Sequence, residues 1–275
     1  MRYFWCSLAL MFVLGALSAE GWAKSYSVDD IRITAVVGPD GSMEITENIT
    51  YTFDGGFSYA FREIPTRADE RVSDVVIEAG GRRYTESTDG RPGSFTITRN
   101  EGRTKVTWYY TAKNERRTFS LTYTIKGVVR RYPDTAELYF KFVGEGWDRP
   151  IGNVSVRVQM PTGVESSDLK AWAHGPLHGV VRILPSGVVS LDVSPLPARA
   201  YWEARVLCPA GHFPDVPLAT ERPRLQQVFA EETAWAEEAN RRREAQQRRL
   251  EEEIRLARHR AALARKYLPI SVLIG

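Results

Sequence analysis

The chain has 275 residues, of which 43% are hydrophobic and 26% charged, and its formal net charge is +3. This composition is too apolar for a disordered chain, and a mean hydropathy of −0.32 excludes a protein that crosses a membrane many times. Residues 24–220 carry 24 basic and 24 acidic side chains, whereas residues 221–268 carry 12 basic and 9 acidic ones. A neutral body, long enough for one large domain or two small ones, is therefore joined to a charge-dense segment.

The amino terminus has the pattern of a secretion signal. Arg2 precedes an uncharged run of 15 residues, 3–17, which is shorter than the roughly 20 residues that span a bilayer. Small residues follow at cleavage-site spacing. We predict a signal peptide over residues 1–23, cleaved after Ala23. Cleavage after Ser18 and an uncleaved anchor are the alternatives, and a signal or an anchor each places the body outside the cytoplasm.

Signal cleavage also changes the cysteine count. Cys6 lies inside the hydrophobic run and leaves with the signal, so Cys208 remains alone. No intrachain disulfide is then possible, and the body must be stabilised by its hydrophobic core.

Hydrophobic and polar residues alternate through most of residues 24–217, which is typical of half-buried strands. A hairpin is predicted where the turn Pro39-Asp40-Gly41 separates two such runs, 28–36 and 43–53. Further strands are predicted at 72–79, 94–99, 104–111, 117–129, 137–143, 154–160, 180–184, 188–193 and 201–207. The fold class is therefore mainly β. We expect an antiparallel β-sandwich, or two packed sandwich subdomains that divide near residues 130–152.

A charged helical arm is predicted over residues 218–267. Thr220 and Pro223 resemble a helix start, and residues 221–268 contain no glycine. A continuous helix of this length would reach about 70 Å. Its thin apolar stripe favours a solvated stalk, with a coiled-coil oligomeriser as the alternative. Nucleic-acid binding is not expected, because Glu251, Glu252 and Glu253 interrupt the basic run.

The last eight residues, 268–275, are uncharged and mostly apolar. Eight residues cannot cross a bilayer, so we interpret them as the start of a transmembrane span that the sequence truncates. The preceding residues 241–268 hold 10 basic and 4 acidic side chains, which could meet anionic lipid head groups. The lipid bilayer is therefore an expected partner.

Short motifs follow one another in a fixed order along the body. They are Ile31-Arg32-Ile33, Asp40-Gly41-Ser42, Ile45-Thr46-Glu47, Tyr51-Thr52-Phe53, Phe61-Arg62-Glu63-Ile64-Pro65, Arg117-Thr118-Phe119, Ala136-Glu137-Leu138-Tyr139, Gly146-Trp147 and Glu203-Ala204-Arg205-Val206. This series resembles the domain of unknown function 2207 family, the amino-terminal part of predicted bacterial membrane proteins. The resemblance covers roughly residues 26–209. It implies an exported β domain at the cell membrane, on its periplasmic or extracellular face, and it implies no catalytic residues.

Candidate chemistry is sparse. His174 and His178 have the spacing of helical metal ligands, but Gly175-Pro176 breaks the helix that this spacing needs. Cys208 and His212 lie near each other at a predicted strand end, without a second histidine or an oxyanion motif. We therefore predict no catalytic residues, no metal and no cofactor.

The segment from Phe57 to Arg67 is the candidate interaction surface. Phe57, Tyr59, Phe61, Arg62 and Arg67 surround Pro65 on an expected connection between strands. Aromatic side chains together with arginine can bind a partner, or they can cover the open edge of a sandwich.

These observations favour a membrane-anchored extracytoplasmic β module with a non-enzymatic structural, sensing or interaction role in the bacterial envelope. Two alternatives stay open. One is an envelope hydrolase whose site is assembled across strands. The other is a subunit of a transport or secretion assembly that oligomerises through the helical arm.

Overall fold

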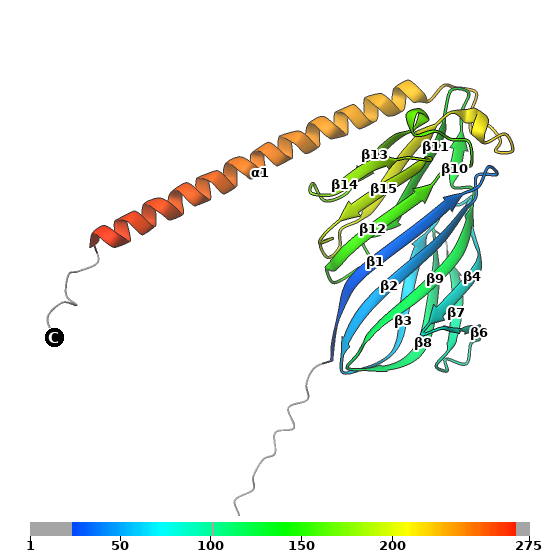
Figure 1. Cartoon of the computed structure of the whole chain (residues 1–275), viewed down its shortest axis with the longest axis horizontal. Coiled ribbons are helices and arrows are strands. Elements are labelled where there is room, and N and C mark those ends of the chain that lie inside the picture. Colours follow the sequence, from blue (N-terminus) through cyan, green and yellow to red (C-terminus); the bar gives the residue numbers. More distant parts are fainter. Residues whose placement is uncertain (1–23, 101, 268–275) are drawn as a thin grey trace, which may run out of the picture.

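The computed structural model describes residues 24–100 and 102–267 (Figure 1). The predicted signal peptide, the predicted start of a span and Cys6 lie outside the described residues. The mainly β prediction is confirmed: strands form three sheets, and one long helix, α1 (Leu225–Tyr267), ends the described chain.

One sheet has eight strands and the other two have four each. The eight-stranded sheet has the order β14 (Val180–Leu184), β15 (Val188–Val193), β12 (Ile151–Gln159), β1 (Ser25–Val37), β2 (Met43–Asp54), β9 (Arg116–Lys126), β4 (Arg71–Ala79), β5 (Arg82–Arg83). The second sheet has the order β3 (Gly56–Pro65), β8 (Arg103–Lys113), β7 (Ser94–Asn100), β6 (Thr85–Glu86). The third has the order β10 (Val129–Arg131), β11 (Ala136–Val143), β16 (Trp202–Cys208), β13 (Lys170–His174).

The core lies between the long sheet and the two short ones. Figure 1 shows β3, β8 and β7 beside the lower part of β1, β2 and β9, with β10, β11 and β13 near the end where α1 begins. Alternate residues of β1, from Ile31 to Val37, are buried, as the alternation in the sequence predicted. Buried side chains from all three sheets form one hydrophobic cluster.

Strand β1 lies between β2, which follows it directly in the sequence, and β12, which is more than 100 residues away. It pairs antiparallel with β2 and parallel with β12, from Val28↔Ile151 to Val36↔Gln159. The parallel pair was not expected, because alternation along a strand does not identify its neighbours. The eight-stranded sheet contains strands from before and from after residues 130–152. The division into two subdomains near these residues stays a prediction.

Several boundaries differ from those predicted. The single run 117–129 is two strands, β9 and β10, separated by Gly127 with φ +81°. A Cβ at Gly127 would lie 3.1 Å from the carbonyl oxygen of Asp69, so the turn needs glycine. The segment expected to be a connection, around Phe61, is instead the edge strand β3.

Helix α1 begins at Leu225, seven residues after the start of the predicted arm at 218. The carboxylate of Asp134 accepts hydrogen bonds from the backbone N–H groups of Arg224 (2.9 Å) and Leu225 (3.1 Å). The hydroxyl of Thr220 accepts instead from the N–H of Arg222. The helix is therefore capped by a residue far away in the sequence, which local pattern cannot reveal.

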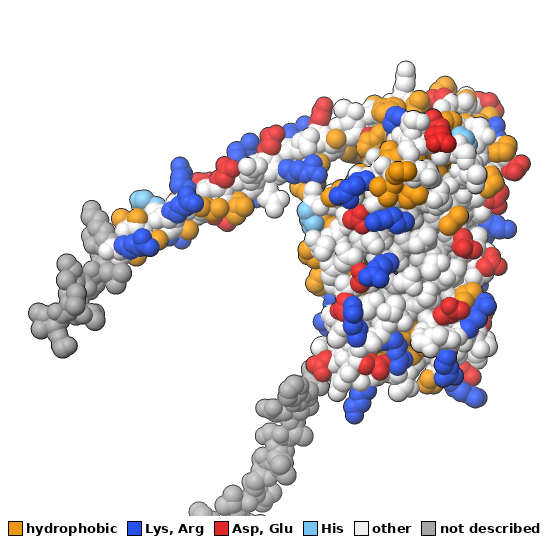
Figure 2. Space-filling model, in the orientation of Figure 1, with side chains coloured by type: hydrophobic (Ala, Val, Ile, Leu, Met, Phe, Trp, Pro, Cys, Tyr) orange, Lys and Arg blue, Asp and Glu red, His pale blue; other side chains and the backbone are white. Residues whose placement is uncertain are grey.

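Only the first turns of α1 pack on the body. Val228 is fully buried and Glu232 is 3% exposed, and the last contact is a hydrogen bond from Arg243 to the carbonyl of Leu177. Residues 246–265 are exposed throughout, and Figure 2 shows basic and acidic side chains mixed along the arm. Among the described residues, no helix combines the length and apolar character needed to cross a bilayer.

Candidate functional site: a groove along the edge of strand β3

A groove with a volume of about 850 Å³ lies beside β3. Its walls come from the start of β1, the end of β2, strand β3, Tyr110 of β8 and the connection between β11 and β12. The lining residues are Lys24, Tyr26, Tyr51, Phe53, Phe57, Ser58, Tyr59, Ala60, Phe61, Arg62, Glu63, Pro65, Gly102, Arg103, Tyr110, Gly144, Glu145, Gly146, Trp147 and Asp148. The volume lies in the range of small-molecule and cofactor pockets.

The groove faces the edge of β3 and not one of its faces. All seven residues from Phe57 to Glu63 line it, whereas a strand face would contribute only every second residue. Strand β3 is the outermost strand of its sheet and pairs only with β8. Its second edge is therefore open to the groove.

The floor of the groove is aromatic. Phe53 lies 5.5 Å from Tyr51 in a stacked arrangement and 4.9 Å from Phe57, measured between ring centroids. Tyr51 is only 4% exposed. Its burial raises the pKa of its hydroxyl above the ordinary value, and the nearby Tyr110 raises this pKa further. Among the described residues its hydroxyl has no hydrogen-bond partner. The floor thus offers apolar contact together with one unused polar atom.

Arg62 connects the three sheets behind the groove. Its Nε donates to Glu47 of β2 (2.8 Å), and its Nη2 donates to the carbonyl of Phe142 in β11 (2.7 Å). Glu47 also accepts from the hydroxyl of Tyr123 in β9. Arg62 and Glu47 are 4% and 1% exposed. Burial alone would lower the pKa of Arg62, but Glu47 raises it, so the guanidinium stays charged.

Side chains cap two carbonyls on the open edge of β3. The hydroxyl of Tyr110 donates to the carbonyl of Tyr59 (3.2 Å), and Nη1 of Arg62 donates to the carbonyl of Glu63. Such caps limit the pairing of an exposed edge strand with other chains. Between the two capped carbonyls lies Phe61.

Most charges at the rim are satisfied within the protein. Glu63 pairs with Arg103 (3.3 Å), Glu145 pairs with Lys141 (2.9 Å), and Asp148 accepts from the hydroxyl of Tyr26 (2.9 Å). Lys24 differs from them. Its Nζ lies 5.3 Å from the ring centroid of Phe57, and no carboxylate of the described residues lies within ion-pair distance of it.

The structure brings four of the five predicted surface residues to the groove. Phe57, Tyr59, Phe61 and Arg62 line it, although Arg62 is buried and its guanidinium is fully engaged. Arg67 does not reach it: its guanidinium contacts Glu70 (2.9 Å) and the carbonyl of Val128 (3.2 Å), beside a smaller hollow of about 190 Å³.

Sequence reasoning missed the aromatic floor and the far wall. Tyr51 and Phe53 fitted an ordinary strand pattern, and Trp147 entered only as part of the family motif Gly146-Trp147. No local signal marks such residues, because the groove exists only where β1, β2, β3 and the β11–β12 connection meet.

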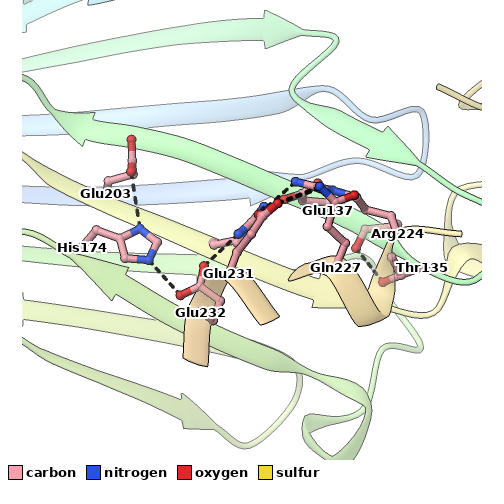
Figure 3. A network of polar contacts seen from close by, with 10 residues as sticks. Thr135, Glu137, His174, Glu203, Arg224, Gln227, Glu231 and Glu232 are labelled. Carbon is pink, nitrogen blue, oxygen red and sulfur yellow. Dashed lines mark hydrogen bonds and ion pairs between the residues drawn. The ribbon is translucent and has the colours of Figure 1, made fainter. Parts of the chain in front are cut away.

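A second polar cluster holds the arm (Figure 3). Arg205 of β16 is 1% exposed, and it donates to Glu137 of β11 and to Glu231 (2.8 Å) and Glu232 (3.0 Å) of α1. The ring of Trp235 lies 5.6 Å from the Arg205 guanidinium. These contacts fix the first turns of the arm on the third sheet.

His174 belongs to the same cluster and is not a loop residue. It lies in β13, where its Nε2 is 2.9 Å from Glu232 and its Nδ1 is 3.4 Å from Glu203. Burial lowers the pKa of His174, but the nearby carboxylates of Glu203 and Glu232 outweigh it and raise the pKa to about 9. His174 is therefore protonated at neutral pH and helps to hold the arm.

The other candidate groups do not converge. His178 bonds to the carbonyl of Pro195 (2.8 Å), and Cys208 is a buried free thiol whose pKa burial raises to about 12. Within residues 24–100 and 102–267, no three His, Cys, Asp or Glu side chains are grouped in a way that could hold a metal ion.

Together these features define a β-sandwich protein with a groove at a free strand edge and a docked helical arm. The chain belongs to the family of predicted membrane proteins that share the DUF2207 amino-terminal domain, whose model matches residues 27–208. The resemblance noted from the motifs is confirmed.

Similar solved structures are distant. An M1 zinc metallopeptidase from Deinococcus radiodurans is 14% identical with a TM-score of 0.39, over 66% of this chain and 42% of that one. A candidate nutrient binding protein from Legionella pneumophila is 9% identical with a TM-score of 0.42, over 66% of each chain. The chain thus spans less than half of the metallopeptidase, and likenesses this low carry no argument about function. No curated protein matches the chain.

Proposed function

We propose that the chain is a membrane-associated binding module of the bacterial envelope, with its β body on the extracytoplasmic side. The observation that carries this proposal is the groove along β3, which joins an aromatic floor to an open strand edge. Membership of a predicted membrane protein family and the signal-like amino terminus support the location. The bilayer is the proposed partner of residues that follow the arm.

The proposed role is binding and not catalysis. Acid–base catalysis needs titratable groups with opposed protonation states that converge on a substrate. At this groove the carboxylates of Glu63, Glu145 and Asp148 are each engaged by a neighbouring side chain. The histidine–carboxylate cluster around His174 lies elsewhere and holds the arm.

Sidedness is tested with a cysteine placed in the groove of the full chain. Ser58 is exposed and lines the groove, whereas Cys208 is buried. A membrane-impermeant maleimide should label the Ser58→Cys variant in spheroplasts and leave the parent chain unlabelled. Labelling only after the cells are lysed would contradict the extracytoplasmic location.

Binding is tested with a photo-crosslinking residue at Tyr59, which is 56% exposed at the rim. The matched control is Val180, 39% exposed on the separate edge strand β14. We expect adducts from Tyr59 in cells and none from Val180, and loss of the Tyr59 adducts when Phe57→Arg fills the groove with charge. Adducts that are equal at both positions, or that persist in Phe57→Arg, would remove the groove from the proposal.

A second role, self-association through the arm, is favoured by the apolar residues that the arm exposes. Leu250 and Ile254 are 56% and 43% exposed, and residues 250, 254, 257, 261 and 264 follow the spacing of a coiled-coil seam. Mass measurement of the full chain in detergent tests this role. A mass above one chain that falls to one chain in Leu250→Glu supports it, and a monomer at all concentrations rejects it.

A further inference from the structure

We propose that the groove binds an extended peptide segment of a partner protein, which adds as an antiparallel strand to β3. The inference rests on the proposed binding function and names the class of ligand. It is carried by the backbone of β3, by an unused hydroxyl in the floor and by one unpaired charge at the rim.

The hydrogen-bond register shows which backbone groups of β3 are free. The N–H of Thr66 donates to the carbonyl of Gly102 (3.1 Å), and the register with β8 is regular from Tyr59 to Pro65. In an antiparallel pair every second residue turns its N–H and C=O to the neighbour. Ala60, Arg62 and Ile64 therefore bond to β8, whereas the N–H and C=O groups of Phe61 point into the groove.

Phe61 is the one position in this stretch that can exchange both hydrogen bonds with a new strand. The carbonyls of Tyr59 and Glu63 on either side are already capped by Tyr110 and Arg62. A ligand residue opposite Phe61 would pair with its N–H and C=O together. The caps thus set a single register for the incoming segment and disfavour other pairings.

The same register assigns the ligand side chains. The residue opposite Phe61 directs its side chain outward, as Phe61 does, and its two neighbours direct theirs inward over the aromatic floor. There the hydroxyl of Tyr51, in a side chain that is 4% exposed, has no partner among the described residues. An aromatic or aliphatic ligand side chain that carries a polar atom can pack on the aromatic floor and form a hydrogen bond with this hydroxyl.

The antiparallel pairing and the position of Lys24 predict which end of the peptide lies near this lysine. Strand β3 runs away from Lys24, because Gly55, just before β3, lies against Lys24. An antiparallel ligand therefore approaches Lys24 with its carboxy-terminal part. Lys24 has no carboxylate of the described residues within ion-pair distance, so it fits an acidic side chain or a free terminal carboxylate, about four residues beyond the position opposite Phe61.

An oligosaccharide is the main competing ligand. Sugars stack on exposed aromatic faces, and Tyr59, which is 56% exposed, supplies such a face at the rim. Sugar stacking would not, however, use the strand edge, to which seven consecutive residues contribute here. The strand edge favours the peptide, and the oligosaccharide becomes an outcome of the test.

The experiment measures binding of the full chain, purified in detergent, to an array of synthetic ten-residue peptides of randomised sequence. Each peptide is made with a free carboxylate end and as the amide, and chitotetraose is measured in parallel. The key variant is Phe61→Pro, which removes the free N–H while edge strands tolerate proline where the N–H is unbonded. The matched control is Phe61→Ala, which keeps the N–H.

We expect a subset of peptides to bind. Phe61→Pro should weaken them about tenfold or more and Phe61→Ala less than about threefold, because only the first removes a backbone hydrogen bond. Lys24→Gln should weaken peptides that place a side-chain or terminal carboxylate near position 24, and it should leave amides without an acidic side chain there unchanged. In the unaltered chain, bound peptide should slow hydrogen exchange at the amides of Phe61 and Glu63, a result that does not depend on how Phe61→Pro folds.

Four results would overturn the inference. Peptides that bind Phe61→Pro as well as Phe61→Ala, or that leave exchange at Phe61 unchanged, exclude strand addition. Chitotetraose bound in a manner sensitive to Phe57→Arg, without any peptide bound, also excludes it but leaves the proposed binding function standing. Absence of both ligands, together with Tyr59 crosslinks that match the Val180 control, rejects the binding function as well.

Discussion

Arg205 and Glu232 form an ion pair of 3.0 Å between the third sheet and helix α1, and their side chains are 1% and 4% exposed. Glu232 accepts at its other oxygen from His174 (2.9 Å), and Arg205 also holds Glu137 and Glu231. A charge that is buried without its partner destabilises a protein strongly. The start of the arm is therefore as much a part of the folded body as the strands beneath it.

Replacing Arg205 by methionine should destabilise the protein by about 3–5 kcal/mol, because the buried carboxylates of Glu137 and Glu232 would lose the guanidinium that lies between them. Arg224 and His174 would remain as the cations nearest to this cluster. Chemical unfolding monitored by tryptophan fluorescence measures this change. The control is Arg241→Met, which breaks the exposed pair with Glu238 and should change nothing measurable. Equal effects of the two variants would show that the Arg205 cluster is not stabilising.

Removing the hydroxyl of Tyr123 should cost about 1–3 kcal/mol, because the buried carboxylate of Glu47 loses one of its donors. Equilibrium denaturation of Tyr123→Phe against the parent chain checks the value. Tyr109→Phe is the matched control, since Tyr109 lies on the outer side of β8 and its hydroxyl makes no hydrogen bond with the described residues. A neutral Tyr123→Phe would mean that Arg62 alone satisfies Glu47.

His174 makes the docking of the arm depend on pH. Its pKa is raised from 6.5 to about 9 in the folded protein, so the protonated form stabilises the fold. The contribution is fully present below pH 6.5 and is lost as the pH rises through 9; it amounts to at most about 3 kcal/mol. Glu203 and Glu232 provide it, and Tyr139 and Trp235 also pack on the ring.

The measurement compares the parent chain with His174→Gln at pH 6 and at pH 10. The parent should be the more stable at pH 6, and the difference should shrink or vanish at pH 10. His178→Gln, outside the cluster, is the control and should show no such change. A difference that stays constant between the two pH values would exclude a protonated His174 in the folded state.

Asp134 caps the arm from a loop of the third sheet. Asp134→Ala should cost about 1 kcal/mol and fray the first turn of α1, because two backbone N–H groups lose their acceptor. Hydrogen exchange at residues 224–228 should accelerate. The matched control is Asp215→Ala, which removes an exposed carboxylate. If Asp215→Ala also accelerates exchange at residues 224–228, the cause is a general charge effect and not capping.

The thiol of Cys208 should be unreactive in the folded protein. It is 3% exposed and its pKa is raised to about 12 by burial, so little thiolate exists at neutral pH. Iodoacetamide at pH 7.5 should modify it only in denaturant, as intact mass shows. Rapid modification of the native chain would mean that the end of β16 opens readily.

Prediction from sequence worked best where one face of a strand is buried. β8, predicted over 104–111, has every second residue buried from Thr104 to Ala112, because that period follows directly from burial on one side. β3 was missed as a strand: its aromatic residues occur on both faces around a bulge between Phe57 and Tyr59, so no clean alternation marks it. The same aromatic residues, together with arginine, nonetheless identified this segment as the candidate surface.

The sequence by itself determined the mainly β class, the helical arm and its charge, and the family, because each follows from local periodicity, composition or ordered motifs. Only the tertiary structure decided that β1 pairs with β12, that Asp134 starts the helix, and that Arg205 and His174 hold it. It also decided that Tyr51, Phe61 and Trp147 border one groove. These are contacts between residues far apart in the chain, and no local pattern encodes which distant partners a folded core brings together.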